Sequence, residues 1–102
     1  MNDKATNPLA DLDQIIHTPA RLNIMTQLYV VESADYIFLK NLTGLTWGNL
    51  SAHAAKLAEA GYLEIEKSIV NKKTHTVAKL TGEGRKAFEA YREKMMEVLE
   101  KK

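Results

Sequence analysis

Residues 42–65 decide the fold, and they read LTGLTWGNLSAHAAKLAEAGYLEI. Gly44 ends one helix in this stretch, because glycine adopts the left-handed conformation without a clash at Cβ. Thr46 follows two residues later and can cap a second helix with its hydroxyl group. The second helix continues to Gly61, and apolar and polar residues then alternate over 62–67, which predicts a strand. Two helices joined by a tight turn are typical of a helix-turn-helix unit.

Two further helices are predicted upstream of this unit. Apolar residues at helical spacing predict a short first helix, and they are Leu9, Leu12, Ile15 and Ile16. Thr18 and Pro19 mark the start of a second helix, because a hydroxyl N-cap followed by proline is a common start signal. The second helix is expected to end near residues 32–34. Asp35 can then cap the third helix, which Gly44 ends.

The last third of the chain predicts a β-hairpin followed by a long helix. Residues 71–73 are polar and form the turn, and residues 74–80 form the return strand. An apolar stripe at helical spacing predicts the final helix over 82–101. The fold class is therefore mainly α with a small β-hairpin, a winged helix-turn-helix with extra N- and C-terminal helices. Residues 9–102 are expected to form a single domain, and residues 1–8 a loose N-terminal arm.

The composition argues against several classes of protein. The chain has 102 residues and no cysteine, which excludes disulfides and thiolate chemistry. No apolar stretch is long enough for a signal peptide or a membrane span, so we expect a cytoplasmic protein. His17, His53 and His75 lie in different predicted elements without a second ligand at zinc spacing, so we expect no metal and no cofactor. Neither a nucleophile elbow nor a glycine-rich phosphate loop is present, and we do not expect an enzyme.

Basic residues gather in one short segment, although the net charge is only +1. Between Lys67 and Thr81 there are four lysines and one histidine, and there is no acidic residue. A basic hairpin that follows a helix-turn-helix is suited to contacts with DNA phosphates or with the minor groove. The second helix of such a unit can lie in the major groove. Double-stranded DNA is therefore the predicted partner.

The outward face of the reading helix supplies the first predicted DNA contacts. When the inward positions are subtracted, the candidate residues that remain are Trp47, Gly48, Asn49, Ser51, Ala52, Ala55 and Lys56. Asn49 and Ser51 can hydrogen-bond to bases or phosphates, and the small residues let the helix sit close to the groove. The hairpin adds Lys72 and Lys73, which can contact phosphates.

Several of these residues also have a purely structural interpretation. Asn49 can serve only in the helix cap, and Trp47 can close the rim of the core instead of stacking on a sugar. Lys72 and Lys73 can be a solvated hairpin tip. Arg21 is expected to make an intramolecular ion pair rather than a phosphate contact.

Three segments together resemble the short, stand-alone winged helix regulators of the ArsR-like and MarR-like superfamily. They are residues 42–65, TPARLNIM at 18–25 and LTGEGRKAF at 80–88, and the resemblance covers roughly residues 9–99. It implies a transcriptional regulator in which residues 46–60 enter the major groove and residues 62–80 form the wing.

The resemblance also extends the predicted site. It places Asn49, Ser51 and His53 at groove-facing positions, although His53 can equally pack beside Leu50 and Leu57. The predicted DNA-binding set is completed by Thr46, Thr74 and His75. The wing tip carries lysines where arginine is common in the family, and lysine lacks the bidentate fork of arginine. Ala54 stands where leucine is usual.

A homodimer is expected, because the terminal helices of the resembling regulators dimerise. The predicted seam consists of Leu12, Ile15, Ile16, Phe88, Tyr91, Met95 and Leu99. A two-fold dimer would bind an inverted-repeat operator with half-sites about 34–36 Å apart. The sequence does not identify a small-molecule effector. The alternative function is a winged helix protein–protein interaction module without DNA binding.

Overall fold

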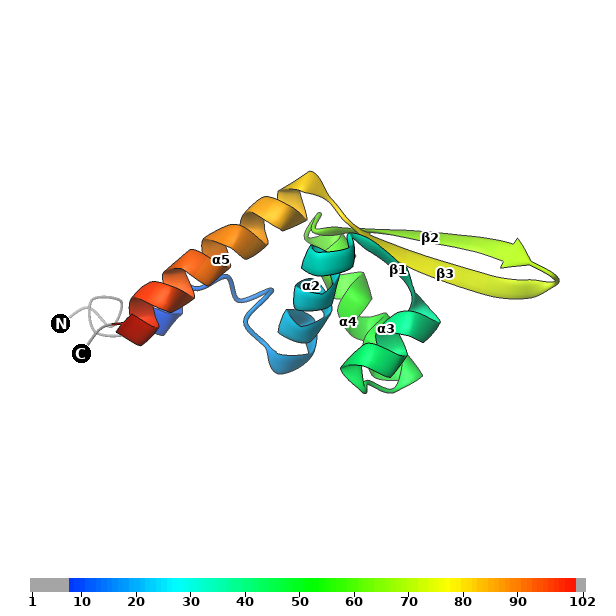
Figure 1. Cartoon of the computed structure of the whole chain (residues 1–102), viewed down its shortest axis with the longest axis horizontal. Coiled ribbons are helices and arrows are strands. Elements are labelled where there is room, and N and C mark those ends of the chain that lie inside the picture. Colours follow the sequence, from blue (N-terminus) through cyan, green and yellow to red (C-terminus); the bar gives the residue numbers. More distant parts are fainter. Residues whose placement is uncertain (1–7, 101–102) are drawn as a thin grey trace.

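The computed structural model describes residues 8–100, which form a winged helix-turn-helix with a long C-terminal helix (Figure 1). In chain order the elements are η1 (Pro8–Asp11), α2 (Pro19–Val31), β1 (Ser33–Asp35), α3 (Tyr36–Thr43), α4 (Trp47–Glu59), β2 (Leu63–Val70), β3 (Lys73–Leu80) and α5 (Gly82–Glu100). The β2–β3 hairpin and α5 project in opposite directions from the body formed by α2, α3 and α4 (Figure 1). The predicted fold class is confirmed.

The helix starts follow the predicted caps. The amide of Arg21 donates to Oγ1 of Thr18, that of Phe38 to Asp35, and that of Asn49 to Thr46, over 2.8–3.2 Å. Gly44 ends α3 with φ 74°, in the left-handed region where a side chain would be strained. These interactions are local in sequence, and for this reason the pattern of residues predicts them well.

The sheet has three antiparallel strands in the order β1-β3-β2. In the hairpin Leu63 pairs with Leu80 and Val70 pairs with Lys73. The turn therefore contains only Asn71 and Lys72, whose φ angles of 51° and 65° are those of a type I′ turn. The predicted turn was one residue too long, because Lys73 belongs to β3. The third strand, β1, was not predicted.

The predicted first helix is wrong beyond residue 11, where the four-residue 3₁₀ helix η1 ends. The carboxylate of Asp13 accepts hydrogen bonds from the amides of Ile15 and Ile16 at 2.8 and 3.3 Å. Such local bonds offer the backbone an alternative to helix. In addition, the residue before Pro19 is pushed toward extended geometry, and Thr18 has φ −141° and ψ 146°.

The core lies where α2, α3 and α4 meet the base of the hairpin, the N-terminal half of α5 and residues 12–16. Its fully buried large side chains are Ile16, Ile24, Met25, Leu28, Leu39, Leu50 and Leu57. Burial of such side chains supplies most of the stabilisation, at about 1.5–3 kcal/mol for each large one. Helix α4 is therefore anchored to the core by its inward face.

Four of the seven predicted seam residues belong to this core. Leu12, Ile16, Phe88 and Tyr91 expose at most 7% of their surface within the single chain. Residues 12–17 fold back over α5, where His17 Nδ1 lies 2.8 Å from the Tyr91 hydroxyl, and Tyr29 of α2 packs against Phe88 at 4.9 Å between ring centroids. These four residues therefore keep little surface with which to line the predicted dimer seam, because the chain covers them itself.

Candidate nucleic-acid interface

The outward face of α4 is polar and carries small side chains. Leu50, Ala54 and Leu57 are buried, as the helical period predicts. The residues that remain exposed on α4 include Gly48, Asn49, Ser51, Ala52, Ala55 and Lys56. Hydrogen-bonding groups on a face without bulk can approach base edges in a groove about 12 Å wide.

Trp47 begins α4 and is 52% exposed, so it does not close the rim of the core. The ammonium of Lys40 on α3 lies 5.2 Å from the centroid of the indole ring, within the range of a cation–π contact. Lys40 was not among the predicted site residues. No local pattern identifies it, because its position beside Trp47 depends on how α3 and α4 cross.

A cleft of about 390 Å³ separates the start of α4 from the wing. It is lined by Asp35, Tyr36, Ile37, Trp47, Thr74, His75 and Thr76. Three predicted site residues, Trp47, Thr74 and His75, are therefore brought together although they are far apart in sequence. Burial raises the pKa of Tyr36, one of the residues that line this cleft.

The wing has two faces, and its basic residues are divided between them. Side chains alternate along a strand, so Lys67 and Ile69 share a face with the core residues Leu63 and Ile65. Thr74 and Thr76 are paired with Ile69 and Lys67 and lie on that same face. The opposite face carries Lys73, His75, Lys79 and the acidic residues Glu64 and Glu66.

Because of this division, only some of the basic residues of the wing lie on the face that continues from the core. Lys67 lies on the face that continues from the core, and it was omitted from the predicted set. The alternation of side chains along the strand, which starts with Leu63 and Ile65, was enough to predict that Lys67 lies on this face. Lys72 lies in the turn, where it is exposed, and Lys73 is exposed on the other face.

His53 is tied to the body of the protein. One guanidinium nitrogen of Arg21, Nη1, lies 3.1 Å from its Nδ1, and Nε of Arg21 donates to the carbonyl of Ile15 at 2.5 Å. Because a guanidinium only donates, Nδ1 must accept, and this leaves Nε2 as the ring nitrogen outside the bond. Arg21 therefore makes intramolecular hydrogen bonds where an ion pair was expected.

Two kinds of feature are absent from the part of the chain that the structure describes. Within residues 8–100, no group of three or more histidine, cysteine, aspartate or glutamate residues could hold a metal ion. Over the same residues, no helix is both long enough and apolar enough to cross a membrane.

Comparisons with known proteins agree with this geometry. The chain is 37% identical to an uncharacterised protein of Methanocaldococcus jannaschii over 78 residues, which are 76% of this chain and 85% of that one. A transcriptional regulator homologue from Pyrococcus horikoshii superposes with a TM-score of 0.82 at 23% identity, over 96% of this chain and 95% of that one.

A second solved structure has the same fold. NadR, in complex with 4-hydroxyphenylacetate, superposes with a TM-score of 0.68 at 22% identity, over 95% of this chain and 71% of that one. At such low identity the likeness of both structures shows the fold alone. The profile of the winged helix DNA-binding domain family matches residues 20–99, which include the helix-turn-helix, the wing and nearly all of α2 and α5. The chain therefore belongs to the winged helix DNA-binding domain family.

Proposed function

We propose that this protein is a sequence-specific regulator of transcription that binds duplex DNA as a homodimer. In this proposal α4 lies in the major groove, and the wing lies on the adjacent backbone or minor groove. One observation carries the proposal: Trp47, the first residue of α4, borders the same cleft as the wing, and the outward face of α4 that follows it is exposed, small and polar. The family match and the regulator described from Pyrococcus horikoshii support a role in transcription.

Electrostatics support contact with a polyanion. Three exposed lysines lie on the proposed surface: Lys56 on α4, Lys67 on the core-side face of the wing and Lys72 at the tip of the wing. Each lysine that neutralises a phosphate releases counterions, so the affinity should fall steeply as salt rises. Base preference should come from Asn49 and Ser51, because their side chains can hydrogen-bond to base edges.

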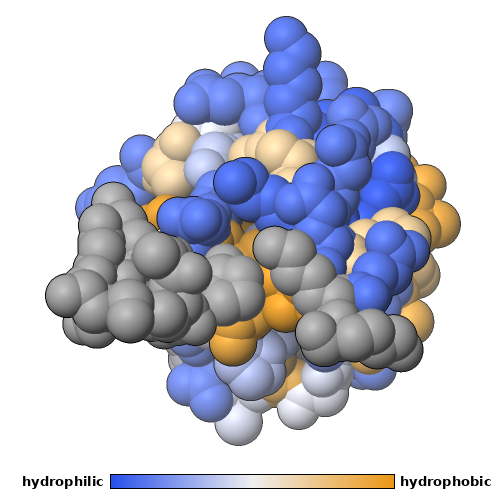
Figure 2. Space-filling model, turned by 90° about the vertical axis from the view of Figure 1, so that its left-hand side faces the viewer, coloured by the Kyte–Doolittle hydropathy of each residue, from blue (hydrophilic) through white to orange (hydrophobic). Residues whose placement is uncertain are grey.

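The free end of α5 supports the dimer. Leu99 is 71% exposed, and Met96 and Leu9 at the same end of the molecule are also exposed. Figure 2 views this end and shows apolar surface among the polar side chains. Leu99 and the half-buried Ile15 and Met95 belong to the seam predicted from sequence, and Leu9 and Met96 extend it. A two-fold contact would cover the same patch on both protomers.

Selection from a randomised duplex pool tests the proposal, followed by a salt titration of the enriched sequence. The expected result is an inverted repeat that two chains bind and that salt weakens. Ser51→Ala should change the selected sequence, whereas Glu59→Ala, at the end of α4, should not. No enrichment with folded wild-type protein would overturn the proposal.

A second candidate function is a protein-interaction module, which one observation favours. On α3, Ile37, Phe38 and Leu42 are 42–61% exposed, and large exposed apolar side chains are typical of protein-binding surfaces. This candidate predicts no salt-sensitive DNA binding, and the selection described above therefore discriminates between the two.

A further inference from the structure

The start of α5 is fastened to the end of α4. Oγ1 of Thr81 donates to the carbonyl of Gly61 at 2.7 Å and accepts from the amide of Gly84 at 2.9 Å. The amide of Thr81 also donates to the carbonyl of Tyr62 at 3.1 Å. These bonds fix the point from which α5 leaves the body, but a helix held at one point can still tilt.

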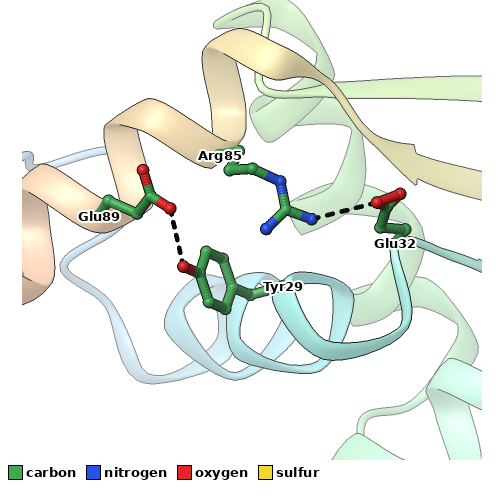
Figure 3. Close-up of polar contacts among 4 residues, drawn as sticks. All are labelled: Tyr29, Glu32, Arg85 and Glu89. Atoms are coloured by element: carbon green, nitrogen blue, oxygen red, sulfur yellow. Dashed lines mark hydrogen bonds and ion pairs between the residues drawn. The ribbon is translucent and has the colours of Figure 1, made fainter.

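A second attachment, farther along α5, is made by Tyr29 of α2 (Figure 3). The Tyr29 hydroxyl donates to the carboxylate of Glu89 at 2.8 Å. The guanidinium carbons of Arg85 and Arg92 lie 4.8 and 5.4 Å from the centroid of its ring, which makes two cation–π contacts. Phe88 packs against the same ring at 4.9 Å between centroids. One side chain thus contacts two turns of α5.

Arg85 extends this attachment to the end of α2. Its Nη2 lies 3.5 Å from the carboxylate of Glu32, as Figure 3 shows. Glu32 has φ 69°, which is unfavourable for a residue with a side chain. The amide of Leu80 donates to the Glu32 carbonyl at 2.8 Å. The end of α2, the end of the wing and the start of α5 therefore meet at this residue.

We propose that Tyr29 is a positioning residue that sets the angle between α5 and the winged helix, and thereby the half-site spacing that the dimer prefers. This inference rests on the proposed function, in which the free end of α5 joins two protomers. Tyr29 packs against α5 and not against the reading face of α4, so it acts through α5 and not through DNA.

The length of α5 makes the spacing sensitive to this angle. A helix of 19 residues is about 28 Å long, so a tilt of about 10° moves its far end by about 5 Å. One base-pair step is about 3.4 Å. Both protomers of a two-fold dimer tilt equally, and a small angular change therefore shifts the preferred separation by more than one base pair.

The test measures binding to a series of duplexes that carry the selected inverted repeat with one or two base pairs added to or removed from its centre. Wild type should prefer one spacing by about tenfold or more. Tyr29→Leu, which removes the hydroxyl and the aromatic ring, should reduce this preference to threefold or less or move it to another spacing. Tyr29→Phe keeps the ring and should lie between the two.

Two controls separate positioning from stability. Lys86→Ala, on the same turn as Arg85, should keep the wild-type preference. Affinity for a duplex with a single half-site should be unchanged in all variants, because the reading face is intact. If Tyr29→Leu does not fold, Arg85→Gln gives the same test at a side chain that is 35% exposed.

The outcomes distinguish this inference from the proposed function. Folded Tyr29→Leu or Arg85→Gln protein that keeps the wild-type spacing preference would overturn the inference alone. Wild-type protein that binds no inverted repeat would overturn the dimeric regulator, and the inference with it.

Discussion

Arg21, in the first turn of α2, donates a hydrogen bond to Nδ1 of His53, in the middle of α4, over 3.1 Å. A second bond from Arg21 Nε holds the carbonyl of Ile15. The same guanidinium therefore joins the N-terminal segment, α2 and α4.

Loss of this junction should destabilise the fold. Arg21→Met should lower the free energy of unfolding by about 2 kcal/mol, because hydrogen bonds to charged groups contribute about 1.5–3 kcal/mol. Urea unfolding measures the change, with Lys56→Met as an exposed control that should stay within about 0.5 kcal/mol. A double variant with His53→Ala should lose less than the sum of the two single changes. Strict additivity would mean that the pair does not interact.

Gly84 should tolerate no side chain. A Cβ at this position would lie 2.2 Å from the carbonyl oxygen of Tyr62, and backbone cannot move aside cheaply. We expect Gly84→Ala to cost about 3 kcal/mol or more in the free energy of unfolding. Gly82→Ala is the matched control in the same turn, because nothing lies within 4 Å of its Cβ. Equal melting temperatures of the two variants would contradict this account of the α4–α5 junction.

Tyr62 should make stability depend on alkaline pH. Burial, the hydrogen bond to Asp13 and the nearby charges of Asp13 and Glu83 raise its pKa from 10.0 to about 12. A raised folded-state pKa means that the folded protein holds this proton more tightly than the unfolded chain. The resulting stability is present below pH 10 and is lost as the pH rises toward 12.

Comparison with Tyr62→Phe isolates this contribution from the other groups that titrate at high pH. Urea unfolding at pH 8, 10 and 11 should show a steeper loss in wild type than in the variant. Parallel curves would contradict the raised pKa of Tyr62.

The two faces of the wing should differ in DNA binding. Lys67→Ala should weaken binding to all sequences alike and reduce the slope of log affinity against log salt by about 1. Lys79→Ala removes the same charge from the opposite face, where Lys79 pairs with Glu64 in the sheet, and should leave the slope unchanged. The measurement is fluorescence anisotropy with a labelled duplex at several salt concentrations. Equal slopes for both variants would indicate that the wing acts through its net charge alone.

Gly48 should separate stability from binding. It lies in the first turn of α4, and a Cβ added there would meet nothing within 4 Å, so Gly48→Ala should raise stability by about 0.5 kcal/mol. The added methyl group stands on the reading face, and affinity for the selected duplex should fall. Thermal melting and anisotropy give the two quantities. A variant that binds as well as wild type would place Gly48 outside the contact area.

Local signals predicted the helix-turn-helix well, whereas contacts between distant segments could not be predicted. Thr18, Asp35 and Thr46 cap helices through bonds to residues three positions away. By contrast, β1 carries no strand pattern and exists because Asp35 pairs with Val77, 42 positions later. Its residues are Ser33, Ala34 and Asp35, of which none is a strong strand former.

The candidate site was predicted in part for the same reason. The helical period of α4 separated inward Leu50 from outward Ser51, and both assignments hold. An apolar stripe such as that of Phe88 and Tyr91 shows only that a helix face is covered. It does not show whether the same chain or a second copy covers it. Here the same chain does, because His17 contacts Tyr91 and Tyr29 of α2 packs against Phe88.

The two-residue turn at the wing tip has a consequence for the balance between folding and function. A type I′ turn is most stable with glycine at its second position, and that position is Lys72, with φ 65°. A side chain in the left-handed region costs about 1–2 kcal/mol. The hairpin thus gives up local stability to keep a positive charge at its farthest point from the core. The positive charge that Lys72 presents to solvent explains why lysine stands at this position. A redesign of the protein for stability alone would replace Lys72 with glycine.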